Sequence, residues 1–146
     1  MGSGNGINEG LLLLDTHSWL WAQLGQADRF SRGARSAIDA AADGGLLRVS
    51  VISVWELSML ERRGRISLPV DLRTWVREAM EEPGVLLAPL TAEIALESNH
   101  LPGNLHGDAA DRILAATARI LGATLLTKDR RLLEYAGHHY VRALPA

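Results

Sequence analysis

The chain has 146 residues, of which 47% are hydrophobic, and a net charge of −2. This length and composition are typical of one globular domain with a substantial core, so disorder is not expected. The net negative charge argues against a protein that coats nucleic acid non-specifically, because such binding needs many Lys and Arg contacts to phosphate. An enzyme that touches only a few phosphates is still compatible with this charge.

The absence of cysteine excludes disulfides and thiolate metal sites and fits a reducing cytoplasm. No apolar run reaches the roughly 18 residues of a membrane span. Residues 1–10 are rich in Gly and Asn and lack the pattern of a secretory signal. We predict that they form a flexible leader, and that residues 11–146 form a single domain.

Four consecutive leucines at 11–14 end on Asp15 and predict a strand that is buried on both faces. Helical spacing of apolar residues follows directly, with Thr16 and Ser18 as its expected caps. Further along the chain, either Ser50 or Ser53 is expected to cap a helix that ends near residue 63. The other predicted strands are 46–51, 85–88, 123–127 and 140–144, and the other predicted helices are 31–42, 69–79, 91–101, 108–121 and 129–135.

Strands therefore alternate with helices, which predicts βαβ units and a mostly parallel sheet. In such a sheet the carboxyl ends of the strands and the amino ends of the helices share one edge. Asp15 and Asp129 directly follow predicted strands, and Glu56 and Asp111 fall in the predicted first turns of helices. Asp108 lies three residues before Asp111 and faces the same way if the helix has begun. We therefore expect all of these acids to meet at one edge, where open α/β folds bind ligands.

Carboxylates gathered in this way repel one another. Two unit charges 4 Å apart interact by about 4 kcal/mol at an effective dielectric of 20, whereas a helix amino end offsets only about 0.3–1 kcal/mol per acid. Either some acids are protonated or a cation is bound. A site of oxygen ligands suits Mg²⁺ or Mn²⁺ rather than Zn²⁺, and it is able to orient a water for attack on a phosphodiester. The competing interpretation is structural, because any one such acid is more often a helix cap.

Four segments together resemble the PIN-domain ribonucleases, in particular the VapC toxins of bacterial toxin–antitoxin pairs. They are Leu-Leu-Leu-Asp-Thr-His-Ser-Trp-Leu-Trp at 12–21, Ser-Val-Ile-Ser-Val-Trp-Glu-Leu at 50–57, His-Gly-Asp-Ala-Ala-Asp-Arg-Ile-Leu-Ala-Ala-Thr-Ala at 106–118, and Leu-Leu-Thr-Lys-Asp at 125–129. Each motif alone is weak, but four in this order and spacing are specific. The likeness extends from residue 11 to about residue 144.

The resemblance implies an α/β fold, a PIN-like three-layer α/β/α sandwich with a mostly parallel four- to five-stranded sheet. It implies a metal-dependent endoribonuclease that uses Mg²⁺ or Mn²⁺ to cleave transfer, ribosomal or messenger RNA. It also implies a homodimer neutralised by a small VapB-type antitoxin whose tail lies in the active-site groove, in a heterotetramer or larger complex. The acids Asp15, Glu56, Asp111 and Asp129 correspond to the catalytic and metal-binding set of the family.

Asp108 matches an extra acid of one branch of the family and is a candidate metal ligand. The sequence departs from that branch at Ala109 and Ala110, where Pro-Phe is usual. Thr127 is a candidate to hydrogen-bond an acid or a metal-bound water, and Ser53 is a candidate either to assist Glu56 or to cap its helix.

Arg112 is a candidate contact to RNA phosphate, although ordinary surface charge explains any single cation equally well. The same two interpretations apply to Lys128, Arg130 and Arg131. His17 and His106 are candidates for base binding or proton transfer, which phosphoryl chemistry on a metal does not require. Trp21 is a candidate for base stacking, whereas core or dimer-interface positions are the simpler expectation for Trp19, Trp21, Trp55 and Trp75.

Two other functions fit parts of the pattern. A flavodoxin-like phospho-acceptor domain also ends its first strand on Asp and carries Thr and Lys on later strands, as Asp15, Thr127 and Lys128 do here. That function normally needs acids just before the acceptor, where this chain has Leu13 and Leu14. A catalytically inactive PIN interaction module would have lost some of the acids, and none is missing.

Overall fold

The computed structural model describes residues 10–105 and 107–146. Apart from Gly10, the leader predicted at 1–10 lies outside the described residues, as does His106. No helix in the described ranges is long and apolar enough to cross a bilayer.

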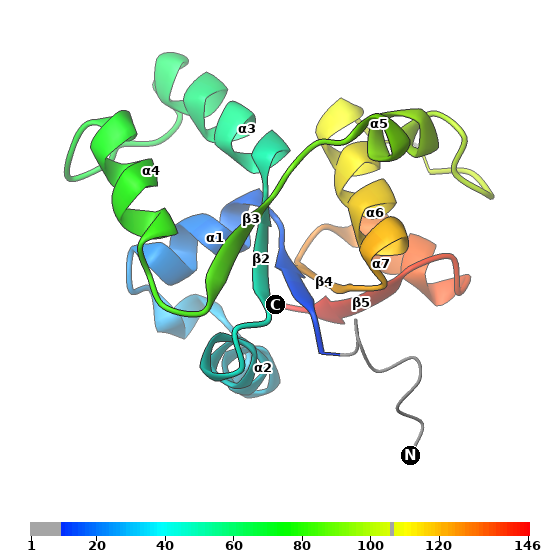
Figure 1. The fold of residues 1–146 in the computed structure, drawn as a ribbon, viewed down its shortest axis with the longest axis horizontal. Helices are drawn as coiled ribbons and strands as arrows, with labels where there is room; N and C mark the ends of the chain where they lie inside the picture. Colours follow the sequence, from blue (N-terminus) through cyan, green and yellow to red (C-terminus); the bar gives the residue numbers. More distant parts are fainter. Residues whose placement is uncertain (1–9, 106) are drawn as a thin grey trace.

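A parallel sheet runs through the middle of the protein (Figure 1). Its order is β3-β2-β1-β4-β5, and every neighbouring pair is parallel. This confirms the predicted parallel sheet, and the predicted strand at 140–144 is present as the edge strand β5. The strands in the described residues are β1 (Leu12–Leu14), β2 (Leu47–Ser50), β3 (Val85–Ala88), β4 (Thr124–Thr127) and β5 (Arg142–Pro145).

The leucine run is buried on both faces of the sheet because successive side chains of a strand point in opposite directions. Leu12 and Leu14 pack into one hydrophobic core, and Leu11 and Leu13 pack into a second core on the other side. Each is at most 7% exposed. A central strand with two apolar faces therefore requires helices on both sides.

Helices cover both faces of the sheet, which confirms the three-layer arrangement (Figure 1). Helices α1 to α4 lie on one side, whereas α6 and α7 lie on the other with α5 packed beside α6. The helices of the described residues are α1 (Thr16–Gln23), α2 (Arg32–Asp43), α3 (Val51–Arg62), α4 (Leu72–Met80), α5 (Ala92–Ser98), α6 (Ala109–Leu121) and α7 (Arg130–Gly137), with a 3-10 turn η2 (Ala27–Arg29).

Some predicted helix starts were wrong. The cap of α1 is Asp15 itself, whose Oδ1 accepts the backbone N–H of Ser18 at 2.9 Å, rather than Thr16 or Ser18. Of the two serines expected to cap α3, Ser50 is the cap, because its hydroxyl accepts the N–H of Ile52 at 3.0 Å. Since α3 begins directly at the end of β2, Glu56 lies in its second turn and not in the predicted first turn.

The helix predicted at 91–101 ends earlier, at Ser98. Pro102 follows, and a proline disfavours the helical conformation of the residue before it, here Leu101. The Ser98 hydroxyl instead donates to the carbonyl of Ala95 at 2.7 Å. The residues released from the helix form the connection that leads into α6.

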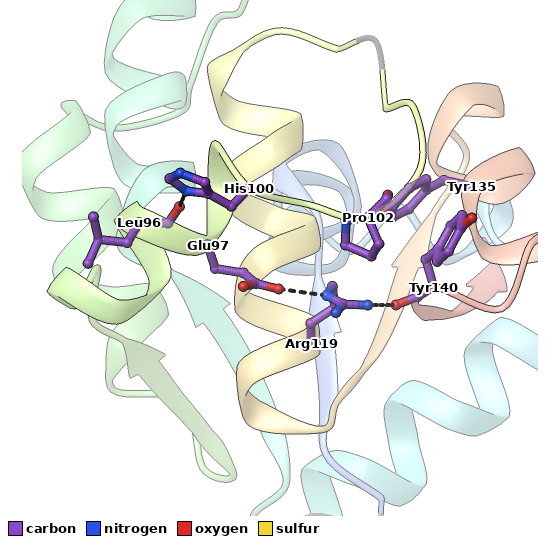
Figure 2. Close-up of polar contacts among 7 residues, drawn as sticks. All are labelled: Leu96, Glu97, His100, Pro102, Arg119, Tyr135 and Tyr140. Carbon is purple, nitrogen blue, oxygen red and sulfur yellow. Dashed lines mark hydrogen bonds and ion pairs between the residues drawn. The ribbon is translucent and has the colours of Figure 1, made fainter.

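Arg119 on α6 contacts both α5 and the segment before the edge strand β5. Figure 2 shows its guanidinium between the Glu97 carboxylate of α5, at 2.8 Å, and the carbonyl of Tyr140 before β5. The Tyr135 hydroxyl of α7 donates to the carbonyl of Pro102 at 2.6 Å. These contacts join α6 to α5 and to the segment before β5, and they join α7 to the connection between α5 and α6.

We predict that Arg119→Met lowers the free energy of unfolding by about 1–2 kcal/mol, because two acceptors lose a charged donor while the apolar stem is kept. Urea unfolding followed by circular dichroism measures this change. Arg32→Met, on the exposed first turn of α2, is the matched control and should change stability by less than about 0.5 kcal/mol. Equal stabilities for the two variants would show that the Arg119 contacts contribute nothing.

Candidate active site

The strand order places a topological switch point beside β1. The chain goes from β1 to β2 and β3 on one side, then returns to β4 on the other side of β1. In open α/β sheets, ligands bind in the crevice outside the carboxyl ends of the strands at such a point. Asp15 directly follows β1, and Asp129 follows β4 by two residues.

A cavity of about 390 Å³ opens at this edge of the sheet. All five predicted acids line it, although they come from four separate segments of the chain. The winding of the chain therefore brings together residues more than a hundred positions apart. The lining residues are Asp15, Thr16, His17, Trp21, Glu56, Asp108, Asp111, Leu114, Lys128, Asp129 and Arg131.

Thr127 joins the ends of the two central strands. Its hydroxyl donates to Oδ2 of Asp15 at 2.6 Å and accepts the backbone N–H of Asp129 at 2.9 Å. The side chain is fully buried, so these partners replace the water that it has lost. Of the two roles considered for Thr127 in the sequence, the contact to an acid is the one present. Asp15 is thereby held through both carboxylate oxygens.

Glu56 is held by a residue that the sequence analysis missed. The buried hydroxyl of Thr16 is hydrogen-bonded to Oε1 of Glu56 and, at 3.0 Å, to the hydroxyl of Ser53. Ser53 therefore connects to Glu56 through Thr16. The available signal was the position of Thr16, which directly follows Asp15 and so lies in the first turn of a helix that begins at the site.

Asp108 and Asp111 share the first turn of α6. Oδ1 of Asp108 accepts the backbone N–H of Asp111 at 2.9 Å and caps the helix. Gly107 approaches closely, because a Cβ there would lie 2.9 Å from Cβ of Asp111. Arg112 donates to the carbonyl of Gly107 at 2.7 Å and is not among the cavity-lining residues. Its contact to RNA phosphate stays a prediction.

Burial is the largest cause that raises the pKa of Asp111 to about 7, and the negative charges of Asp108, Asp129 and Glu56 contribute in the same direction. The positive charge of Arg131 acts in the opposite direction. Repulsion from the neighbouring acids therefore contributes to the raised pKa of Asp111. Protonation or a nearby cation would relieve it.

The donor chemistry of the cavity fits a hard divalent cation, because the acids offer carboxylate oxygens only. Within residues 10–105 and 107–146, however, no three acidic or histidine side chains lie close enough to hold one ion together. Mg²⁺ commonly keeps several waters and uses one or two carboxylates directly, which suits acids that surround a cavity. The metal-binding roles of the individual acids stay predictions.

Comparison with known proteins identifies the family. Residues 12–138 match the PIN domain. This chain belongs to the PIN-domain family. It is 36% identical over 121 residues to ribonuclease VapC22 of Mycobacterium tuberculosis, an alignment that covers 83% of this chain and 88% of the relative. The resemblance to VapC proteins read from the sequence is thus confirmed.

The PIN fold is also found in the crystal structure of VapBC2 from Rickettsia felis bound to a DNA fragment from their promoter. The TM-score is 0.66 at 14% identity, with 92% of this chain and 97% of that chain covered. The flavodoxin-like interpretation was wrong, because that fold places β1 between β2 and β3. In this PIN domain β1 lies between β2 and β4.

We predict that Asp111→Asn stabilises the metal-free protein at pH 8. The unfolded Asp111 ionises near its ordinary pKa of 3.8, whereas the folded group keeps its proton up to about pH 7. Between these values the folded protein binds the extra proton, so the contribution of Asp111 to stability falls as pH rises and is constant above pH 7. After allowance for solvent screening of a partly exposed group, the gain is about 1–2 kcal/mol.

Urea unfolding in a chelating buffer at pH 4, 6 and 8 measures this effect. The variant and the wild type should coincide at pH 4 and separate towards pH 8. Asp71→Asn is the control for the same exchange of groups, since Asp71 lies at the start of α4 away from the cavity and has a lowered pKa. A difference between Asp111→Asn and the wild type that does not change with pH would contradict the prediction.

Proposed function

We propose that this PIN domain is a metal-dependent endoribonuclease toxin that hydrolyses RNA phosphodiester bonds at the acidic cavity. The observation that carries the proposal is the convergence of all five predicted acids on one cavity at the switch point of the sheet. The relative at 36% identity is named a ribonuclease, which supports the same reaction class.

In this proposal one or two of the acids Asp15, Glu56, Asp111 and Asp129 bind Mg²⁺ or Mn²⁺ directly and the others hold its waters, with Asp108 beside them. A bound divalent cation stabilises charge on a phosphoryl oxygen and lowers the pKa of a coordinated water. The chain's own contribution is to orient the acids, because each lies at the start of a helix or beside a buried hydroxyl. The hydrogen bonds to Asp15 and Glu56 described above fix these side chains before substrate binds.

We further propose that a VapB-type antitoxin neutralises the enzyme and that the toxin is a homodimer, in a heterotetramer or larger complex with its antitoxin. The solved relative from Rickettsia felis is a VapBC complex, which supports this class of partner. An acidic cavity also favours a cationic segment as its inhibitor, because opposite charges attract across an interface. Residues 11–146 act as the single domain in this assembly.

We predict that Asp15→Asn and Asp111→Asn each lower metal-stimulated RNA cleavage at least about 100-fold, because a neutral amide cannot balance the metal charge. Cleavage of fluorescent single-stranded RNA, with and without Mg²⁺ or Mn²⁺, measures the effect. Asp71→Asn exchanges the same groups at a helix cap outside the cavity and should retain full activity.

Retained cleavage in either site variant would refute the site. Circular dichroism of each variant separates a lost fold from a lost activity. A wild-type protein that binds RNA but never cleaves it would instead support the inactive PIN interaction module.

We also predict that millimolar Mg²⁺ or Mn²⁺ raises the Tm of the wild-type protein, because a ligand that binds only the folded state stabilises it. The rise should be larger at pH 8 than at pH 5, since protonated acids do not bind the ion. Differential scanning calorimetry with Asp111→Asn tests this, because the variant should lose most of the shift. A Tm that is independent of metal at both pH values would argue against a functional cation site.

A further inference from the structure

A basic and aromatic cluster lies beside the acids, and we call Trp21, Arg29 and Lys128 the Trp21 cluster. The Arg29 guanidinium lies 5.2 Å and the Lys128 ammonium 5.1 Å from the centre of the Trp21 ring. The Lys128 ammonium also donates to the backbone carbonyl of Arg29. Trp21 and Lys128 line the same cavity as the acids and form one of its walls, and Arg29 lies beside them without being among the lining residues.

The Trp21 ring is half-buried and packs against a neighbouring ring. It packs edge-on against the buried Phe30 ring, with ring centres 6.0 Å apart at an angle of 69°. His17 lies one helical turn earlier on α1, with its ring 5.9 Å away, and also lines the cavity. A partly buried ring with few rotatable bonds loses little entropy when a flat ligand stacks on it.

The cations of the cluster do not neutralise the acids. Lys128 is the only lysine of the chain and directly precedes Asp129. Across the residues that the structure describes, the only ion pair is Arg119–Glu97, in the α5–α6 layer. Lys128 and Arg29 instead contact the Trp21 ring and are exposed. Exposed cation–π contacts are weak, so a phosphate offering charge-assisted hydrogen bonds is able to replace them.

We propose that the Trp21 cluster is a nucleotide subsite for single-stranded RNA, which deepens the proposed ribonuclease function and rests on it. The base of a nucleotide next to the scissile phosphate stacks on Trp21 with His17 at its edge. Lys128 and Arg29 bind the backbone phosphate of that nucleotide. Single-stranded RNA is the substrate class because a base inside a duplex cannot reach an aromatic side chain. Trp21 is therefore a substrate-positioning residue that selects unpaired RNA.

The single lysine allows a direct binding test without catalysis. The wild-type protein is acetylated with an amine-selective reagent in a chelating buffer, and mass spectrometry follows Lys128, with the N-terminal amine as the internal reference. A single-stranded RNA of about 12 nucleotides, within the range of site sizes known for single-strand binding, is the probe. It should slow the acetylation of Lys128 at least threefold, whereas the same sequence as a duplex should not.

Cleavage kinetics test the ring itself. Trp21→Leu should raise KM about 5- to 100-fold, the range expected for loss of one stacked base, with kcat changed less than about twofold. Trp21→Phe should restore most of the loss. Trp55→Leu is the matched control, because Trp55 is 56% exposed and does not line the cavity, and it should leave KM unchanged.

The salt dependence separates the roles within the cluster. Lys128→Gln should make the slope of log affinity against log salt shallower by about 0.7, the value for one phosphate contact on a single strand, whereas Trp21→Phe should leave it unchanged. Arg32→Gln, an exposed cation in the first turn of α2 that does not line the cavity, is the control and should leave the slope unchanged.

The outcomes distinguish the subsite from the proposed function. The subsite would be overturned, and the nuclease kept, if the wild type cleaves RNA while RNA does not protect Lys128 and Trp21→Leu has the same KM as the Trp55→Leu control. Protection of Lys128 by single-stranded RNA in a protein that never cleaves would keep the subsite and refute the nuclease. Equal protection by duplex and single strand would overturn base stacking.

Discussion

Electrostatic repulsion among carboxylates at the switch point is the constraint on which the rest of this structure depends. Burial and the neighbouring acids raise the pKa of Asp111 to about 7, so the folded chain holds these groups together against their mutual repulsion. The opposing stabilisation comes from the sheet, where Leu13 and Leu125 on one side and Leu14 and Leu126 on the other are at most 1% exposed. Burial of apolar strands thus fixes the edge at which the acids meet.

Three of the acids that line the cavity are also helix caps, so the structural and the functional interpretation apply to the same carboxylates. Asp15, Asp108 and Asp129 each cap a helix through Oδ1, which accepts backbone N–H groups. Such hydrogen bonds and the positive end of the helix dipole stabilise negative charge, so capping offsets part of the repulsion in the cavity. Asp111 caps no helix and is the acid with the raised pKa. A role as a helix cap is therefore compatible with a role in the site, because capping stabilises the clustered negative charges.

The sequence was sufficient to predict the elements that depend on local pattern, and the comparisons support the family read from its motifs. The leucine run ending on Asp15 defines the central strand, and alternation of strands and helices defines the edge where the acids lie. The sequence could not predict that α3 starts at once after β2, which moves Glu56 to the second turn and brings it to Thr16. That contact depends on packing between α1 and α3, and the position of Arg29 depends on a 3-10 turn that no periodicity indicated.

Lys128 and Arg29 lie beside the acids of this cavity and form no ion pair with them in the part of the chain that the structure describes, because these two cations have other partners. The carboxylates of Asp15, Glu56, Asp108 and Asp129 are bound by backbone N–H groups or by the hydroxyls of Thr16 and Thr127. The cations are bound by the Trp21 ring and by the carbonyl of Arg29. An ion pair between Lys128 and Asp129 would neutralise both walls at once and leave little attraction for external ions. Because the two walls stay separate, one retains its attraction for a cation and the other for a phosphate, which are the two charges that cleavage of an RNA strand brings to one place.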